Sequence, residues 1–359
     1  MNTQAGNLDL MDRIDAVLGK IDGYVWGIPL IVLILAVGLL LTVRTGLIQV
    51  RHLPKALRYM LKNEEDGEGD VTSFGALCTA LSATIGTGNI VGVATAIAAG
   101  GPGALFWMEV AAFLGMATKY SEGLLAVKYR EIDSDGKVLG GPFYYIEKGM
   151  GKNWKWLAVL FAIFGMLVGI LGIGTMTQIN GITAAVQNFF DPDRAMTAFS
   201  LGEHSYAWPT VISGVLVTLF AALVIIGGIK RIAKVSEIIV PFMAVVYFVC
   251  GLILIICNIT KIPSAVVLIV QSAFSPKAAL GGAIGITIQS AMRNGIARGI
   301  FSNESGIGSA PIAAAAAKTK EPVRQGLVCM TGTFLDTIII CTITGLAIAS
   351  SGVLGMTNE

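Results

Sequence analysis

The sequence predicts an all-α membrane protein that crosses the bilayer several times. Hydrophobic residues make up 54% of the 359 residues and charged residues only 13%, and the mean hydropathy of +0.75 is far above that of soluble proteins. Apolar segments alternate with charged stretches, which is the pattern of spanning helices and their loops. One long apolar segment is interrupted by glycine and polar residues, and this interruption indicates a binding site within the bundle.

Eight hydrophobic elements divide the chain. They lie near residues 24–43, 72–98, 103–127, 156–188, 208–228, 236–257, 262–292 and 325–351. The first has the length of a simple span, since one bilayer crossing needs about 20 apolar residues.

The second element is expected to be a broken helix. No charged residue occurs from Val71 to Met108, and the middle of this stretch reads Gly86-Thr87-Gly88-Asn89. Glycines let the backbone leave helical geometry, and the freed amide groups would form a carboxylate site with the positive end of a helix dipole behind them. Freed carbonyl groups and the Asn89 side chain would suit a hard cation such as Na⁺. A close contact between two helices is the alternative, because small residues also favour such contacts.

Polar residues mark the third and fourth elements. Glu109 lies about a turn inside the third, whereas Lys119 and Glu122 lie near its cytoplasmic end, where they are expected to pair or to extend toward water. In the fourth, Gln178 belongs to a polar group in an otherwise apolar run. A buried amide needs a partner, so Gln178 is expected to face the bundle interior, either as a ligand contact or as a hydrogen bond between helices.

The last two elements also carry polar signals. Pro276 and the Gly281-Gly282 pair interrupt 262–292, which indicates either a second broken helix or an extracellular turn. Asp336 lies near the middle of the last element, where a charged residue is functional by default or else a paired structural group. Between these elements, the polar stretch 293–308 is expected at the cytoplasmic mouth. There Arg298 and Glu304 would form a gating ion pair or simply hold the loop.

Loop charges predict the orientation. Lys and Arg gather in the loops at 44–62, 128–155, 230–234 and 318–324, and the alternate loops are poor in them. The positive-inside rule therefore places the N-terminus outside the cell and these loops in the cytoplasm of a multi-pass plasma membrane protein. A net charge of +2 argues against nucleic acid as a partner. No nucleophile–base pair or metal-ligand spacing is evident, so an enzyme is not expected.

Several blocks of this sequence resemble the alanine or glycine:cation symporter family, also called sodium:alanine symporters. The blocks are Ser82–Val93, Gly100–Met108, Gly115–Glu122, Gly140–Tyr145 and Gly295–Glu304, and they occur in the family's order. The likeness extends from about Gly23 to Ser350. Glu109 departs from the family pattern, which usually has Trp at this position.

The resemblance implies the leucine-transporter fold, in which two five-helix repeats have inverted topology. In one membrane transport domain over 1–359, an extracellular segment (1–23) and one extra helix (24–43) would precede the first repeat (72–257). Residues 262–351 would begin the second repeat, and the family continues for about three more helices. The expectation is therefore a second repeat that is incomplete within these residues and a chain that does not complete a transport cycle.

By the same resemblance, the activity is symport of Na⁺ with a small neutral amino acid, alanine or glycine, by alternating access. Rival interpretations are a non-transporting or decayed paralogue and, with less support, an ion channel. No cofactor and no obligate protein partner are implied; the implied partners are the amino acid, Na⁺ and membrane lipid. The substrate-binding candidates are Thr87, Gly88, Asn89, Gln178, Gly282, Ala283 and Gly285. The sodium candidates are Ser82, Ile85 and Asn89, and the gate or structural candidates are Asp336, Arg298 and Glu304.

Overall fold

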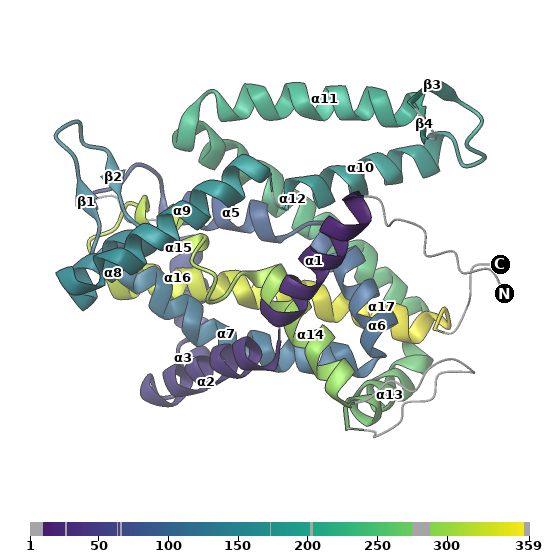
Figure 1. The fold of residues 1–359 in the computed structure, drawn as a ribbon. Helices are drawn as coiled ribbons and strands as arrows, with labels where there is room; N and C mark the ends of the chain where they lie inside the picture. The colour runs from purple at the N-terminus through teal and green to yellow at the C-terminus, as the bar shows by residue number, and fades with distance from the viewer. Residues whose placement is uncertain are drawn as a thin grey trace.

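The fold was analysed in a computed structural model, which describes residues 10–25, 27–62, 64, 67–172, 174–201, 204–274 and 288–354. Helices account for nearly all of the regular structure (Figure 1). In chain order they are α1 (Leu10–Val25), α2 (Ile28–Arg44), α3 (Ile48–Arg51), α4 (Leu53–Leu61), α5 (Ser73–Thr84), η1 (Gly88–Gly92), α6 (Val93–Gly100), α7 (Gly103–Lys128), α8 (Pro142–Met150), η2 (Lys152–Trp154), α9 (Lys155–Leu171), α10 (Thr175–Phe190), α11 (Trp208–Ile225), α12 (Gly228–Cys257), η3 (Ile259–Lys261), α13 (Ile262–Phe274), α14 (Ile288–Asn303), α15 (Ala310–Ala315), α16 (Pro322–Thr333), η4 (Phe334–Cys341) and α17 (Thr342–Ser351).

Two short antiparallel hairpins complete the described structure. Strand β1 (Glu131–Ile132) pairs with β2 (Val138–Leu139) after α7, and β3 (Thr197–Leu201) pairs with β4 (His204–Ala207) between α10 and α11. Both hairpins lie in connections between long helices.

Membrane-spanning helices dominate the described part of the chain. Five helical segments there are long and apolar enough to cross a bilayer, and the bent pair of Ser73–Thr84 and Gly88–Gly100 makes a sixth. Large apolar side chains such as Phe164, Phe220 and Phe242 are exposed on α9, α11 and α12, as expected for surfaces that face lipid. These observations confirm an all-α polytopic architecture; the inverted-repeat fold stays a prediction.

The buried centre of the molecule is built around α7. This helix packs against α14, α16 and α2, whereas Figure 1 shows α10 and α11 along one edge of the molecule. Small residues permit the close packing: a Cβ atom added to Gly115 would lie 3.0 Å from Ser305, and one added to Gly123 would lie 2.6 Å from the Cys329 sulfur. Small residues at such contacts replace the hydrophobic driving force that is absent between membrane helices.

Three predicted segments differ from the structure. Part of the N-terminal segment 1–23 belongs to α1, which precedes the extra helix, observed as α2. The fourth element, 156–188, is two helices because Gly172 and Gly174 have φ angles of +63° and +88°, which end a right-handed helix.

The third difference concerns the polar stretch 293–308. It was expected as a loop at the cytoplasmic mouth, but residues up to Asn303 belong to α14. This helix avoids lipid by burying Gly295, Ile296 and Gly299 within the protein. The interruption predicted around Pro276 and Gly281-Gly282 lies outside the described residues.

Candidate functional site

The second element bends by 54° between α5 and the helical segment that begins at Gly88. Helical hydrogen bonding is interrupted at Ile85 and Gly86, and η1 then continues as a π-helix. The predicted break in mid-span is therefore confirmed, but its predicted extent, from Gly86 to Asn89, is wrong. The second half already begins at Thr87 and Gly88.

The Asn89 side chain explains why the break is so short. Its Oδ1 accepts a hydrogen bond from the Gly86 amide at 2.8 Å, and the Asn89 amide donates to the Gly86 carbonyl at 3.2 Å. The side chain thus satisfies a backbone donor that the interrupted helix leaves free. Because of this bond, Asn89 Oδ1 faces the break rather than an open ion position.

Gln178 of α10 lies directly against the break. Its Oε1 accepts from the Thr87 amide at 3.0 Å and from the Thr87 hydroxyl at 2.9 Å. A Cβ atom at Gly86 would lie 2.7 Å from the same oxygen, so only glycine permits this approach. Gln178 therefore faces the bundle interior, as its place in an apolar run predicts, and it forms hydrogen bonds between α10 and the broken helix.

On its other side, Asn89 connects the broken helix to η4. Asn89 is only 1% exposed and Asp336 is fully buried. Asn89 Nδ2 donates to Asp336 Oδ1 at 2.8 Å, to the Asp336 carbonyl at 3.0 Å and to Ser302 Oγ at 3.1 Å. Asn89, Ser302 and Asp336 belong to η1, α14 and η4. Their hydrogen bonds therefore join three segments that lie far apart in the sequence.

Hydroxyl groups complete the surroundings of the buried carboxylate. Asp336 Oδ2 accepts from Ser302 Oγ at 2.9 Å and from Thr337 Oγ1 at 2.8 Å, and Asn303 Nδ2 donates to Thr337 Oγ1 at 3.1 Å. We call Asn89, Ser302, Asp336 and Thr337 the Asp336 cluster. Within the described chain no Lys or Arg lies within 4.0 Å of the Asp336 carboxylate.

The chemistry of the Asp336 cluster suits a monovalent hard cation. It gathers the Asp336 carboxylate oxygens and the hydroxyl oxygens of Ser302 and Thr337, and such oxygens are the ligands that hard cations prefer. No group of three or more His, Cys, Asp and Glu side chains with metal-binding geometry occurs among the described residues, so the donor set does not resemble a transition-metal site.

The predicted sodium residues are only partly brought together. Ile85 lies in the break and Asn89 lies just after it, but Ser82 is exposed and its hydroxyl donates to the Thr79 carbonyl within α5. The Asp336 cluster instead contains Ser302 and Thr337, which were not among the predicted site residues, and Asp336, which was predicted as a gate or structural residue and not for sodium. Thr337 stands beside Asp336 in the sequence, whereas Ser302 was hidden in the stretch expected to be a loop.

The predicted gating ion pair is wrong. Arg298 is exposed, and no ion pair joins it to Glu304 in the described chain. Glu304 accepts a hydrogen bond from the Ser309 hydroxyl and has a φ of +54°. These features match the alternative, in which Glu304 holds the loop after α14. Asp336 is not at either surface of the bundle but in its interior.

Two charged residues of α7, Lys119 and Glu122, are buried more deeply than expected. Lys119 is 4% exposed and Glu122 is 8% exposed, so neither extends to water. Lys119 Nζ donates to the Asn303 carbonyl at 2.7 Å, which places a cation at the C-terminal end of α14. Glu109 is partly buried, and its Oε1 has no hydrogen-bond partner among the described residues.

Three substrate candidates, Gly282, Ala283 and Gly285, lie outside the described residues. The remaining candidates lie at the break: Thr87 and Gly88 begin the second half of the helix, and Gln178 covers it.

Comparison with known proteins agrees with the resemblance to the sodium:alanine symporters. The sequence model of the sodium:alanine symporter family matches residues 11–359. An uncharacterized transporter of Haemophilus influenzae is 57% identical over 339 residues, which are 94% of this chain and 70% of that protein. A sodium/alanine symporter of Methanococcus maripaludis is 49% identical over 341 residues, 94% of this chain and 71% of that protein. A putative sodium/proton-dependent alanine carrier of Bacillus subtilis is 41% identical over 335 residues, 93% of this chain and 64% of that protein.

Proposed function

Because the chain belongs to the sodium:alanine symporter family, we propose that it couples Na⁺ entry to the uptake of alanine or glycine by alternating access. The family is one of integral membrane transporters and not of enzymes, and sodium-coupled symport of amino acids is its activity.

The observation that carries the proposal is the position of Asn89. Its Oδ1 accepts a hydrogen bond from the Gly86 amide at the break, and its Nδ2 donates hydrogen bonds to Asp336 and Ser302. A single side chain therefore connects the amide groups suited to a carboxylate with the oxygen cluster suited to Na⁺. Such a connection lets the binding of one solute change the affinity for the other, which is what coupled transport requires.

The substrate carboxylate would bind at Thr87. It would take the hydrogen bonds that the Thr87 amide and hydroxyl now donate to Gln178 Oε1, assisted by the positive end of the helix dipole. The displaced Gln178 amide would then bind the amino acid. Na⁺ would bind the Asp336 carboxylate with the hydroxyl oxygens of Ser302 and Thr337, and the amide oxygen of Asn89 would join after its bond to Gly86 opens.

Crowding at the break favours a small side chain. A Cβ atom on Gly86 would lie 2.7 Å from Gln178, and one on Gly181 would lie 2.5 Å from the Thr87 methyl group. Helix α10 therefore approaches the break too closely to leave room for a large apolar group. This close approach supports alanine or glycine over leucine or phenylalanine as the substrate.

Uptake by purified protein in proteoliposomes tests the proposal. An inward Na⁺ gradient should drive accumulation of radiolabelled alanine, and glycine should compete whereas leucine and phenylalanine should not. A K⁺ gradient of the same size at the same pH is the control. Equal accumulation in both gradients would contradict sodium coupling, and equal competition by phenylalanine would contradict the substrate assignment.

A further inference from the structure

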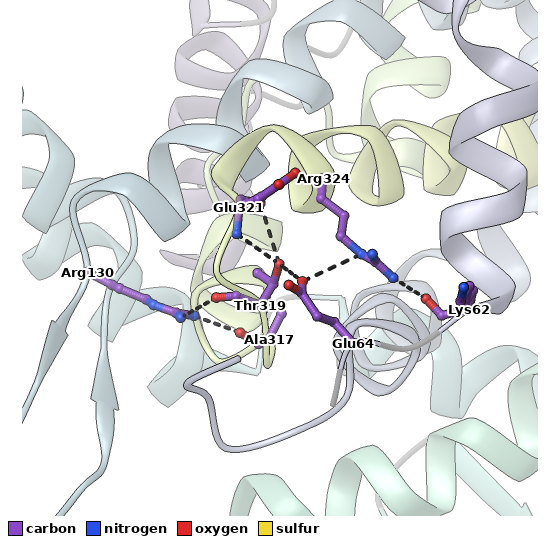
Figure 2. Close-up of polar contacts among 7 residues, drawn as sticks. All are labelled: Lys62, Glu64, Arg130, Ala317, Thr319, Glu321 and Arg324. Carbon is purple, nitrogen blue, oxygen red and sulfur yellow. Dashed lines mark hydrogen bonds and ion pairs between the residues drawn. The ribbon is translucent and has the colours of Figure 1, made fainter. Parts of the chain in front are cut away.

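Arg130, just beyond the end of α7, joins several connections at one end of the bundle. Its guanidinium donates to four backbone carbonyls, at residue 68 and within residues 315–319. Figure 2 shows the bonds to Ala317 and Thr319. The acceptors are Ala315 at 2.8 Å, Ala317 at 2.7 Å, Glu68 at 2.6 Å and Thr319 at 3.0 Å. A planar guanidinium can reach several carbonyl groups at once, which an ammonium group cannot do in the same geometry.

Burial lowers the pKa of Arg130, and the carboxylates of Glu68 and Asp70 oppose that change. An arginine keeps its charge in proteins, so all four bonds are charge-assisted. The described structure contains no carboxylate within 4.0 Å of this guanidinium, and the charge is therefore directed at backbone groups.

Further bonds connect the same segments. The Lys318 amide donates to the Val71 carbonyl at 2.7 Å beside a parallel bridge between Val71 and Ala317. The Thr319 hydroxyl donates to Glu64 Oε2 at 2.6 Å, and Arg324 Nε lies 3.7 Å from the same oxygen. Figure 2 shows Glu64 between Thr319 and Arg324. We call Arg130 with its four carbonyl acceptors the Arg130 clasp.

Each segment held by the clasp leads to a residue of the Asp336 cluster. Glu68 precedes α5, which leads across the break to Asn89. Ala315 ends α15 and Ala317 follows it, and α15 is the next helix after α14, which carries Ser302. Thr319 precedes α16, which continues into η4 and Asp336. At about 1.5 Å per residue, the 12 residues of α5 span roughly 18 Å, and Asp336 lies roughly 21 Å beyond Pro322.

We propose that Arg130 is a positioning residue for the cation site. By fixing the starting points of α5 and α16 and the exit of α15, it sets the relative placement of Asn89, Ser302 and Asp336. Helix α5 is stiff up to the break and α16 continues directly into η4, so a displacement at the clasp is carried to the break beside Asn89 and to Asp336. This inference rests on the proposed function, since it assumes that the cluster binds Na⁺.

The test compares Arg130→Ala, Arg130→Lys and Lys128→Ala in proteoliposomes. Lys128 is a matched control, because it is an exposed cation two residues away whose described contact is with the Tyr129 ring. The measured quantity is the Na⁺ concentration for half-maximal alanine uptake, together with the maximal rate at saturating Na⁺. Arg130→Ala should raise the half-maximal Na⁺ concentration by about tenfold or more, because charge-assisted hydrogen bonds are lost.

Arg130→Lys should lie between the wild type and Arg130→Ala, since one ammonium group restores only part of the bonding, and Lys128→Ala should match the wild type. At saturating Na⁺, the Arg130→Ala rate should recover toward the wild-type rate. If Arg130 only stabilised the fold, Arg130→Ala would instead lower the maximal rate or the thermal stability and leave the Na⁺ dependence unchanged. That result would overturn the proposal.

If Arg130→Ala does not give a monodisperse protein, Arg130→Lys decides: a wild-type Na⁺ dependence in this variant would also overturn the proposal. Failure of the proposed function has a different signature. Alanine uptake that is independent of Na⁺ in the wild type would refute both the symport assignment and the cation site, whereas a normal Na⁺ dependence in the Arg130 variants would refute the role of Arg130 alone.

Discussion

Asp336 is the residue whose burial most needs an explanation. A charged residue at the centre of a membrane helix costs about 2.5–3.5 kcal/mol on insertion scales. Asn89, Ser302 and Thr337 all donate hydrogen bonds to it, yet the described structure pairs it with no cation. Neutral donors reduce the cost of a buried carboxylate but do not neutralise its charge. In the proposed function, a bound Na⁺ would compensate this charge.

Gln178→Ala tests the substrate site at the level of one side chain. The variant removes the oxygen that accepts hydrogen bonds from the Thr87 amide and hydroxyl. It also removes the side-chain amide that is proposed to bind the amino acid. The alanine KM should rise by about tenfold, equivalent to one lost hydrogen bond of about 1.4 kcal/mol. Membrane insertion should be unaffected, since an apolar replacement favours insertion.

Gln187→Ala is the matched control for this prediction. It removes the same side chain from the same helix, at a position where Gln187 accepts from Thr210 at 3.0 Å instead of contacting the break. The alanine KM of this variant should stay close to that of the wild type. Equal KM values in Gln178→Ala and the wild type would assign Gln178 a structural role only.

Sequence alone was sufficient for some site residues and not for others. Asn89, Gln178 and Asp336 stand out because a polar group in an apolar span must find a partner. Ser302 gives no such signal, because it lies in a polar stretch where one more hydroxyl carries no information. A stripe of small residues four apart, Ala291, Gly295 and Gly299, is the signal that would have identified α14 as a buried helix.

At the scale of elements, the break is determined by local polar bonds as well as by glycine. Both Gly86 and Gly88 allow non-helical backbone, yet only the first lies in the break. The Asn89 side chain bonds the Gly86 amide, so the helix can resume immediately. Such a bond depends on the three-dimensional arrangement of the break, and composition therefore predicts that the helix breaks but not how far the break extends.

Hydropathy has a similar limit for α9 and α10. Residues 156–188 are mostly apolar, and the polar group around Gln178 lies after the point of division, so hydropathy gives no reason to divide them there. Gly172 and Gly174 divide them because both adopt positive φ angles. Sequence shows that these glycines are present, but not that they leave the helical conformation.

Gly86→Ala tests the broken helix as an element. The added methyl group would lie 2.7 Å from Gln178 Oε1, so the glutamine or the break must move. Alanine uptake should fall by about tenfold or more, in line with a steric cost of 1–3 kcal/mol for overpacking. Gly165→Ala on α9 is the control, because a Cβ atom there meets nothing within 4 Å. Wild-type uptake by Gly86→Ala would show that the break tolerates a side chain and that the close approach of α10 is not required.

At the scale of the whole molecule, α7 connects the site to one end of the bundle. Lys119 bonds the last carbonyl of α14 next to the Asp336 cluster, and Arg130, beyond the end of the same helix, holds the segments that lead there. The positive-inside rule predicts that the Arg130 end is cytoplasmic. In the alternating-access mechanism proposed above, this helix would connect the proposed cation site to that end of the bundle.

We propose that the Asp336 cluster binds the Na⁺ that moves with the amino acid. The most direct measurement is entry of ²²Na⁺ into proteoliposomes with and without external alanine. Alanine should stimulate ²²Na⁺ entry in the wild type, and Asp336→Asn should abolish that stimulation because the amide keeps the shape and loses the charge. Asp191→Asn is the control, since among the described residues this buried carboxylate accepts hydrogen bonds from the Ala195 and Met196 backbone amides, and stimulation by alanine should persist in this variant. Alanine uptake without ²²Na⁺ entry, or undiminished stimulation in Asp336→Asn, would contradict the account.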